Sequence, residues 1–268
     1  MRILLTNDDG VLSPGIRTLA AALAARGWLE AVVAPDRERS GMGHAITVDR
    51  PLRAKPLADA PYPQGIPVLA CDGTPTDCVS LGADLLYPAA DCVVSGINQG
   101  PNLGDDVTYS GTVCAAMEGV LLDRPSVAVS LCLEDGETIR HNETAARAAL
   151  AVLELLPLDR KKPALWNVNV PNLPPEKLKG FRVTRMGERR YTDKFTATRD
   201  PRGNDCYWIS GKIRDCMGEG ADVTAVAAGY VAVTPITLDM TDYSCLNAMR
   251  EETAQERFEK AFLQEIEK

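Results

Sequence analysis

The stretch MRILLTNDDG, residues 1–10, decides the fold that we expect for the rest of the chain. Arg2 to Thr6 is rich in leucine and contains no turn-forming residue, which predicts a buried strand. Asn7 to Gly10 is then the loop at the carboxyl end of that strand. Ser13-Pro14 starts a helix, and Leu29 to Ala34 forms a second apolar strand. This order of strand, helix and strand is typical of a parallel sheet and predicts an α/β fold.

Asp8 and Asp9 place two adjacent carboxylates in the first loop. In an open α/β sheet, ligands bind at the carboxyl ends of the strands. Neighbouring carboxylates repel each other unless positive charge lies between them, and a hard divalent cation prefers oxygen ligands of this kind. The alternative is an Asx turn that caps the following helix. These ten residues alone leave both interpretations open.

The composition is that of an ordinary globular protein with one large domain, or a domain and an appendage. Of 268 residues, 45% are hydrophobic and 25% are charged. The net charge of −8 argues against a protein that grips nucleic acid through its phosphates. No stretch is long and apolar enough for a membrane span, and the N-terminal residues do not resemble a secretory signal. We therefore expect a cytoplasmic protein without nucleic-acid or membrane partners.

Eight cysteines and two histidines narrow the chemistry further. The absence of a C-x-x-C pair excludes zinc-ribbon and thioredoxin spacings and favours reduced thiols. Cys206 and Cys216 are a pair that could face each other across a hairpin. His44 is interpreted first as a loop or packing residue and second as a candidate acid. Because two histidines cannot form a site of three imidazoles, catalysis is expected to rest on carboxylates, hydroxyls and amides.

The loop after the second strand, PDRERSGMGHAIT (residues 35–47), combines charged residues with a small turn. Gly41 and Gly43 match only the first half of a dinucleotide fingerprint, so an NAD site is not expected. The hydroxyl of Ser40 and the backbone amide of Gly41 are nevertheless expected at the mouth of the sheet, within reach of a ligand. A plain flexible loop is the alternative.

A second dense stretch, residues 95–119, follows the strand predicted at residues 91–95. It ends in an alanine-rich helix predicted over residues 112–122. Unpaired N–H groups and the helix dipole favour an anion at the start of that helix. The candidate phosphate-binding residues of this stretch are Asn98, Asn102, Ser110, Gly111 and Thr112. The alternative is that Ser110 or Thr112 only caps the helix.

The regular pattern of strands and helices changes between residues 175 and 185. We therefore expect a Rossmann-like core over residues 1–178, with a mostly parallel sheet flanked by helices, and a C-terminal part over residues 179–268. Up to the change, further elements are predicted at residues 68–71, 77–86, 126–131, 142–156 and 165–170.

The C-terminal part is expected to contain a long β-hairpin over about residues 190–213, whose aromatic side chains pack across its strands. A strand returning to the core is predicted over about residues 223–234, and a terminal helix over about residues 248–267. One face of that helix carries an apolar stripe formed by Ala254, Phe258, Phe262 and Ile266. The hairpin and the stripe both need a covering surface, on this subunit or on another.

Several stretches, in one order along nearly the whole chain, resemble the motifs of the survival protein SurE family. They are ILLTNDDG (3–10), APDRERSG (34–41), GTPTDCV (73–79), SGINQGPNLG (95–104), YSGTVCAAMEG (109–119), NVNVP (167–171) and GYVAVTP (229–235). Cys114 stands where the family is expected to have glycine or another small residue. This departure concerns helix packing and leaves the expected ligand positions intact.

The resemblance implies a 5′-nucleotidase, a metal-dependent phosphomonoesterase that hydrolyses nucleoside 5′- and 3′-monophosphates and, in some members, short polyphosphate. It implies one divalent cation per subunit, Mg²⁺ or Mn²⁺, held by the residues that match Asp8, Asp9, Ser40 and Asn98. It also implies a homodimer or tetramer built through the C-terminal part.

The hypothesis that follows is hydrolysis by water activated at the cation, which attacks phosphorus in line. Asp8 or Asp9 orients or deprotonates that water. The candidate phosphate-binding residues, together with Gly41, cradle the phosphate oxygens. Two rivals remain: an aspartyl-phosphate phosphatase with Asp8 as nucleophile, which usually has a D-x-D motif, and a non-catalytic nucleotide or metal sensor.

Overall fold

In the computed structural model, the first predicted strand is β1 (Ile3–Thr6), which is buried along its whole length in a nine-stranded sheet. It pairs in parallel with β2 (Leu29–Pro35) on one side and with β5 (Cys92–Gln99) on the other. Helix α1 (Pro14–Ala25) connects β1 to β2 and begins after Ser13, as predicted. The structure describes residues 1–58, 60–133, 136–192, 195–209, 211–251 and 254–266.

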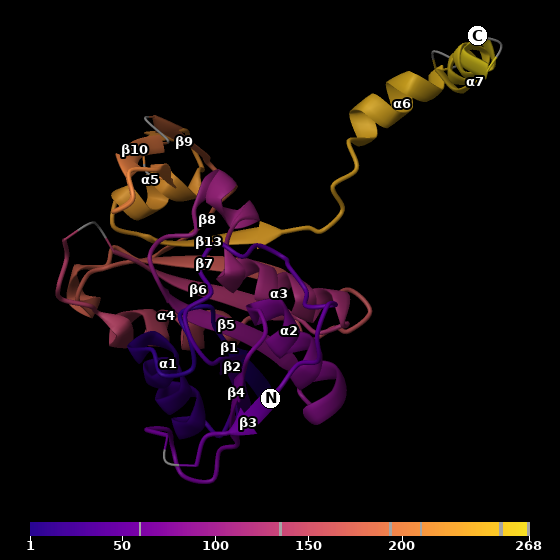
Figure 1. Cartoon of the computed structure of the whole chain (residues 1–268). Helices are drawn as coiled ribbons and strands as arrows, with labels where there is room; N and C mark the ends of the chain where they lie inside the picture. Colours follow the sequence, from indigo (N-terminus) through magenta and orange to yellow (C-terminus); the bar gives the residue numbers. More distant parts are fainter. Residues whose placement is uncertain (59, 134–135, 193–194, 210, 252–253, 267–268) are drawn as a thin grey trace. The chain divides into compact units, whose positions relative to one another are not determined.

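The remaining strands extend the sheet on both sides of this centre (Figure 1). They are β3 (Ala54–Pro56), β4 (Val68–Cys71), β6 (Ser126–Cys132), β7 (Leu165–Pro171), β8 (Phe181–Val183) and β13 (Val231–Ile236). Their order is β3-β4-β2-β1-β5-β6-β7-β13-β8. Pairing is parallel except between β3 and β4 and between β7 and β13. The predicted mostly parallel, Rossmann-like sheet is confirmed.

Helices cover both faces of the sheet (Figure 1). Helices α1 and α4 (Asn142–Leu153) pack on the face that carries Ile3 and Leu5. On the opposite face, the side chain of Leu4 meets α2 (Pro75–Val79), its π-helical continuation η1 (Ser80–Leu86) and α3 (Gly111–Leu121). Short 3₁₀ helices, η2 (Gly104–Thr108) and η3 (Pro175–Lys177), lie in the connections. Alternation of side chains between two covered faces explains why β1 is apolar throughout.

The carboxyl ends of β1 and β5 form the switch point of the sheet. From β1 the chain builds β2 and β4 on one side and then crosses to β5 on the other. Thr6 at the end of β1 lies opposite Ser95 in β5. The strand β5 continues to Gln99, so it includes the start of the stretch that the sequence assigned to a loop. Ligands of open α/β sheets bind at such a switch point.

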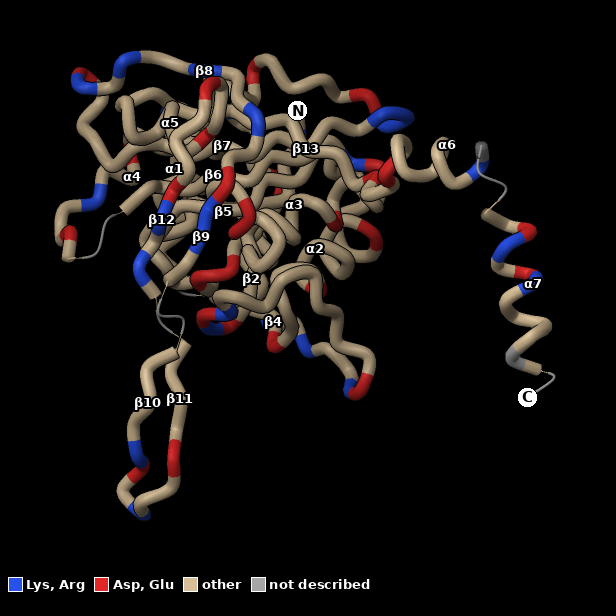
Figure 2. Tube along the Cα trace, turned by 90° about the horizontal axis from the view of Figure 1, so that it is seen from above, with Lys and Arg blue, Asp and Glu red and all other residues tan. Residues whose placement is uncertain are grey.

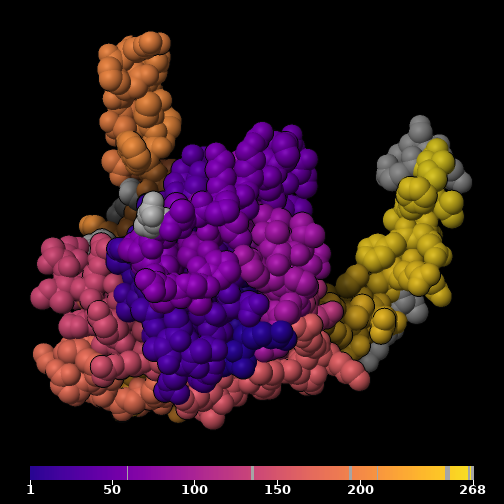
Figure 3. Space-filling model, turned by 90° about the horizontal axis from the view of Figure 1, so that it is seen from below, coloured from indigo at the N-terminus to yellow at the C-terminus, as the bar shows by residue number. Residues whose placement is uncertain are grey.

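The predicted hairpin is present and is divided into a base and a tip. The base pairs β9 (Glu188–Thr192) with β12 (Lys212–Cys216), and the tip pairs β10 (Phe195–Arg199) with β11 (Asp205–Ile209). Figure 2 shows the tip extending away from the sheet, and Figure 3 shows it in orange, protruding from the surface. The predicted hairpin also includes residues 193–194 and 210, which lie outside the described residues.

The hairpin register shows that the proposed pairing of Cys206 with Cys216 is wrong. Cys206 lies opposite Thr198, and Cys216 lies opposite Glu188, so both cysteines occupy the same arm of the hairpin. All eight cysteines are free in the structure.

The structure of residues 222–236 shows that a second prediction, one strand over about residues 223–234, is wrong. The first part of this segment is helix α5 (Asp222–Ala227), and only Val231–Ile236 forms β13. Short apolar runs fit a buried helix as well as a strand. Here alanine favours the helix, and Gly229, with a φ of +85°, follows its end.

The chain divides into two compact units, Met1–Ile236 and Thr237–Lys268. The first unit extends beyond the expected core of residues 1–178 because β8 and β13 complete the main sheet. The second unit contains two helices, α6 (Tyr243–Glu251) and α7 (Ala254–Ile266), in place of one terminal helix over residues 248–267. Residues 252–253 and 267 of that prediction are not described. Among the described residues, no helix is long and apolar enough to cross a membrane.

Candidate active site

Asp8 lies just beyond the end of β1, with only 3% of its surface exposed. The hydroxyl of Thr112 in α3 donates a hydrogen bond to its Oδ1. The backbone N–H of Thr112 also stabilises the carboxylate. Burial outweighs these hydrogen bonds and raises the pKa of Asp8 above its ordinary value. The site therefore holds a carboxylate whose negative charge the protein itself does not fully compensate.

Asp9 adds a second carboxylate beside the first. Its Oδ2 accepts a hydrogen bond from the backbone N–H of Gln99, at 3.2 Å. Burial and the charge of Asp8 raise the pKa of Asp9 to about 7, and Glu38 adds further negative charge. Among the described residues, no lysine or arginine forms an ion pair with Asp8 or Asp9. The charge of Arg140 lowers the pKa of Asp9, but by less than burial and Asp8 raise it, so the pair is short of positive charge.

Helix α3 begins in direct contact with Asp8. A Cβ atom on Gly111 would lie 2.9 Å from both Cβ and Oδ2 of Asp8 and 3.2 Å from Cγ of Pro75. Only glycine therefore allows the first turn of α3 to approach the carboxylate this closely. The N–H groups at this helix end carry partial positive charge.

The predicted phosphate-binding turn, residues 110–112, also forms hydrogen bonds within the protein. The Oγ of Ser110 accepts a hydrogen bond from the N–H of Val113 at 3.1 Å, so Ser110 caps α3. The hydroxyl of Thr112 donates its hydrogen bond to Asp8. Gly111, at the first position of the helix, has an N–H without an intrahelical partner. A phosphate oxygen could therefore accept from the N–H of Gly111 or from the hydroxyl of Ser110, which keeps its own O–H while it accepts from Val113.

Asn102 lies in a buried polar cluster formed by β6 and β7. Its Nδ2 donates to Oγ of Ser130 at 2.7 Å, and its backbone N–H donates to Oδ1 of Asn169 at 2.9 Å. The carbonyl oxygen of Asn102 accepts from Nδ2 of Asn167 at 2.8 Å and from Nδ2 of Asn169 at 2.9 Å. The NVNVP stretch thereby fixes the loop at Asn102. A phosphate contact through Nδ2 would compete with the bond to Ser130.

The family resemblance implies Asn98 and Ser40 as metal ligands; Asn98 lies in β5 and Ser40 in the loop after β2, and these two strands flank β1. Asn98 donates from Nδ2 to the carbonyl of Gly100 at 2.9 Å, and no described residue donates to its Oδ1. Ser40 is exposed and donates from Oγ to Oε1 of Glu38 at 2.9 Å. Its neighbour Arg39 donates a backbone hydrogen bond to the carbonyl of Asp8 at 2.7 Å, which ties this loop to the site. Gly41 is exposed.

This set of donors fits a hard divalent cation. The carboxylates of Asp8 and Asp9 are short of positive charge, and the Oδ1 of Asn98 and the hydroxyl of Ser40 are neutral oxygen donors. Within the described ranges, no group of three or more His, Cys, Asp or Glu side chains is arranged to hold a metal. Such an ion therefore needs the amide and hydroxyl oxygens in addition to the two carboxylates.

The family model described as survival protein SurE matches residues 3–193 of the chain. The chain belongs to the survival protein SurE family. A 5′-nucleotidase SurE of Geobacter metallireducens is 49% identical over 93% of this chain and 96% of that protein. A 5′/3′-nucleotidase SurE of Edwardsiella ictaluri is 48% identical over 94% and 95%, respectively. The crystal structure of the SurE protein from Aquifex aeolicus covers 94% of this chain and 100% of its own, with a TM-score of 0.76 and 39% identity.

In this SurE-family chain, contacts with residues far away in the sequence hold the loop that carries Ser40. Asp77, which forms a capping box with Thr74 in α2, accepts hydrogen bonds from the N–H and hydroxyl of Thr47 at 2.9 and 2.6 Å. Nε2 of His44 lies 3.0 Å from Oε2 of Glu118 in α3. His44 is exposed and ties the loop to α3 through this contact.

Three residues around the site were not predicted from the sequence: Glu38, Gln99 and Glu118. Glu38 adds charge near the aspartates, Gln99 binds Asp9 through its backbone, and Glu118 anchors the loop. All three lie in or beside the stretches that resemble family motifs. Membership in those motifs was the available signal, but the contacts themselves appear only when the strands are brought together.

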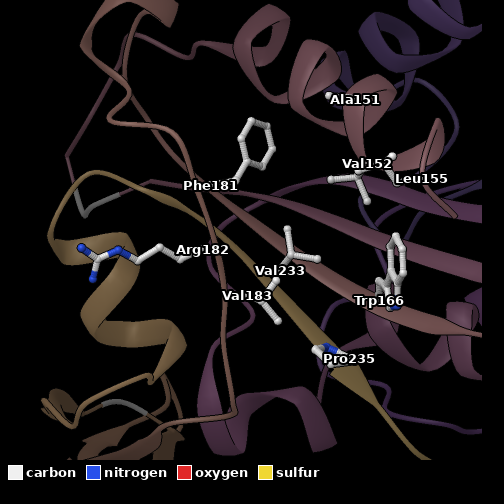
Figure 4. Close-up of a pocket in the computed structure, with 9 residues that line it drawn as sticks. All are labelled: Ala151, Val152, Leu155, Trp166, Phe181, Arg182, Val183, Val233 and Pro235. Atoms are coloured by element: carbon white, nitrogen blue, oxygen red, sulfur yellow. The ribbon is translucent and has the colours of Figure 1, made fainter.

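The SurE-family fold also contains an apolar cavity of about 380 Å³ between α4 and the β7, β13 and β8 edge of the sheet (Figure 4). Trp166, Phe181 and Val233 are among its lining residues. Arg182 points away from the other lining side chains, and its guanidinium lies 4.0 Å from the ring centroid of Tyr230. None of the predicted site residues lines this cavity. Its apolar walls do not suit phosphate chemistry.

Proposed function

We propose that this chain is a metal-dependent 5′-nucleotidase that hydrolyses nucleoside 5′- and 3′-monophosphates to nucleoside and inorganic phosphate. The observation that carries the proposal is the pair Asp8 and Asp9 after β1: Asp8 contacts the first turn of α3, and burial leaves both carboxylates with raised pKa values and too little positive charge around them. The names of the relatives from Geobacter metallireducens and Edwardsiella ictaluri support the same activity.

In this proposal Asp8, Asp9, Asn98 and Ser40 hold one Mg²⁺ or Mn²⁺. When bound, this cation supplies Lewis-acid chemistry, which offsets the charge of the phosphate and makes water more acidic. The uncompensated charge of the two aspartates and the free Oδ1 of Asn98 support this assignment.

Residues of the chain orient the carboxylates, accept the proton and bind the phosphate. Thr112 fixes the orientation of Asp8, so the carboxylate does not need to reorganise during the reaction. Asp8 or Asp9 takes the proton of the attacking water in this proposal; the backbone of Gln99 binds Oδ2 of Asp9, which supports Asp9 for this role through its other oxygen. The N–H of Gly111 donates to a phosphate oxygen as negative charge shifts. One P–O bond forms to water, the ester P–O bond breaks, and the leaving oxygen takes up a proton.

Release of inorganic phosphate tests the proposal. The purified protein is incubated with AMP, 3′-AMP or short polyphosphate, with Mn²⁺ or Mg²⁺, and then with EDTA followed by fresh cation. We expect turnover of both nucleotides that EDTA abolishes and added cation restores. Binding of AMP without phosphate release would favour the sensor, and turnover that survives EDTA would contradict the metal site.

We further propose that the protein works as a homodimer or tetramer assembled through its C-terminal part. One face of the hairpin tip presents Phe195, Tyr207 and Ile209, which are all more than half exposed. Within residues 237–268, Phe258 and Phe262 of α7 are also exposed. An exposed apolar face on either element is typical of an interaction surface. Sedimentation equilibrium should show an oligomer, and Phe258→Asp with Phe262→Asp, or Tyr207→Asp, should shift it towards the monomer; a monomeric unmodified protein would contradict this.

A further inference from the structure

Side chains from the hairpin base and α5 hold the segment that leads into the turn at Ser110. This segment, η2, follows Asn102 and ends just before the turn. The N–H of Gly104 donates to Oδ2 of Asp222 at 3.0 Å. Tyr191 and Arg189, both in β9, reach Oδ2 of Asp106 at 2.7 and 3.1 Å. The turn is therefore fixed by residues more than 80 positions later in the chain.

Arg189 is the centre of these contacts and is only 7% exposed. Its Nε and Nη2 donate to Oδ1 and Oδ2 of Asp215 at 2.7 and 2.9 Å, across the register pair of β9 and β12. Its Nη1 is then directed at Asp106, and its backbone N–H donates to Oδ2 of Asp105 at 3.2 Å. This fork geometry requires a guanidinium, because an ammonium group cannot make a two-pronged contact and a third bond in one plane.

Backbone hydrogen bonds connect Asp106 directly to the turn at Ser110. Its carbonyl oxygen accepts hydrogen bonds from the N–H of Tyr109 at 3.0 Å and from the N–H of Ser110 at 3.1 Å. Ser110 caps α3, and the next residue, Gly111, contacts Asp8. A displacement of Asp106 would therefore move the first turn of α3 relative to the aspartate pair.

We infer that Arg189 is a positioning residue: by holding Asp106 between β9 and η2, it sets the place of the Ser110 to Thr112 turn against Asp8. Arg189 does not touch the reacting atoms, and it connects the hairpin base to the site. This inference rests on the proposed nucleotidase activity. Figure 2 shows β9 and β12 side by side, with acidic and basic residues along both strands. The neighbouring Arg190 is exposed, and its one ion pair among the described residues is with Glu188, which makes it a matched control.

The test compares Arg189→Gln, Arg189→Lys and the control Arg190→Gln in the full-length protein, with AMP as substrate at saturating Mn²⁺. Small misplacement of a binding group costs catalysis heavily, so we expect kcat/KM to fall about 10- to 100-fold in Arg189→Gln. Arg189→Lys should recover part of the loss, because it keeps the charge but not the fork. Arg190→Gln should stay within about twofold of the unmodified protein.

Two further measurements, made below the unfolding temperature, distinguish a positioning role of Arg189 from a purely structural one. Inorganic phosphate should inhibit Arg189→Gln more weakly than the unmodified protein, whereas the Mn²⁺ affinity measured by calorimetry should not change, because the aspartates are untouched. Asp106→Asn should reproduce the kinetic loss, and the double variant should lose no more than either single variant.

Folded Arg189→Gln or Asp106→Asn protein with unchanged kcat, KM and phosphate inhibition would overturn the inference, as would fully additive losses. If Arg189→Gln does not fold, Asp106→Asn decides the question. Absence of turnover in the unmodified protein would instead refute the proposed function, and phosphate binding by the variants would still test Arg189.

Discussion

The two sides of the candidate site differ in how firmly they are built. Asp8 is buried, bonded by Thr112 and in contact with Gly111. Ser40 is exposed, and its hydroxyl contacts only Glu38 among the described residues. The sheet interior therefore fixes one half of the proposed ligand set before any ligand arrives, and a surface loop completes it. Substitutions on the fixed side should damage chemistry, and those on the loop side should mainly weaken binding.

The largest effect is expected from Asp8→Asn on the fixed side. The variant removes a charge that no other described residue replaces, so kcat with AMP should fall on the order of 1000-fold or more. Its thermal stability should be kept or increased, because a buried amide costs less than an uncompensated carboxylate. Phosphate release and thermal unfolding measure the two effects. Asp84→Asn, at an exposed position, is the control. Full activity in Asp8→Asn would contradict the claim that the fixed side carries the chemistry.

Gly111→Ala should have the next largest effect. The added methyl group would lie 2.9 Å from the Asp8 side chain, so the start of α3 or the carboxylate must shift. We expect a loss of about 100-fold in kcat and about 1–3 kcal/mol of stability, as for other overpacked sites. Kinetics at saturating Mn²⁺ and urea unfolding test this. Unchanged kcat would show that the contact between α3 and Asp8 is not needed for catalysis.

The location of the fixed side was largely predictable from the sequence, but the hydrogen bonds of its side chains were not. Asp8, Asp9 and the start of α3 follow strands whose apolar runs and order define a parallel sheet, and such sheets bring strand exits together. By contrast, the duties of Thr112 and Asn102 depend on side chains of Asp8, Ser130 and Asn169 that meet only in the folded chain.

The same reason explains the errors in the C-terminal part. The short apolar segment that became α5 has no periodicity long enough to separate helix from strand. The facing partners of Cys206 and Cys216 depend on hairpin register, which the turn and the pairing set together. Arg189 carries no motif of its own, and its role follows only from the distances to Asp106 and Asp215.

Ser40→Ala should have a smaller effect, confined to binding. Loss of one neutral oxygen ligand should raise the Mn²⁺ concentration needed for half-maximal activity by about 10-fold. At saturating Mn²⁺, kcat should fall less than about threefold, because Asp8 and Asp9 keep their geometry. Titration of activity with Mn²⁺ separates the two quantities. A loss of kcat equal to that of Asp8→Asn would mean that the two sides of the site are equally rigid.

Glu118→Gln should have the smallest effect, because it weakens only the anchor of the loop. Hydrogen bonds from His44 and Ser80 lower the pKa of Glu118 below its ordinary value of 4.5, in spite of partial burial. The folded protein therefore binds this proton less readily than the unfolded chain. The resulting stability is complete above pH 4.5 and is lost as the pH falls through the lower, folded value.

The gap in unfolding free energy between the unmodified protein and Glu118→Gln should then be on the order of 1 kcal/mol at neutral pH and should close in acid. Urea unfolding in the presence of EDTA measures it, with the exposed Glu176→Gln as control. The raised pKa values of Asp8 and Asp9 act in the opposite direction, but they are common to all these proteins and cancel in the difference. A gap that does not depend on pH would mean that the charge of Glu118 does not hold the loop, and that other contacts, such as those of Thr47 with Asp77 and of Arg39 with the carbonyl of Asp8, hold it instead.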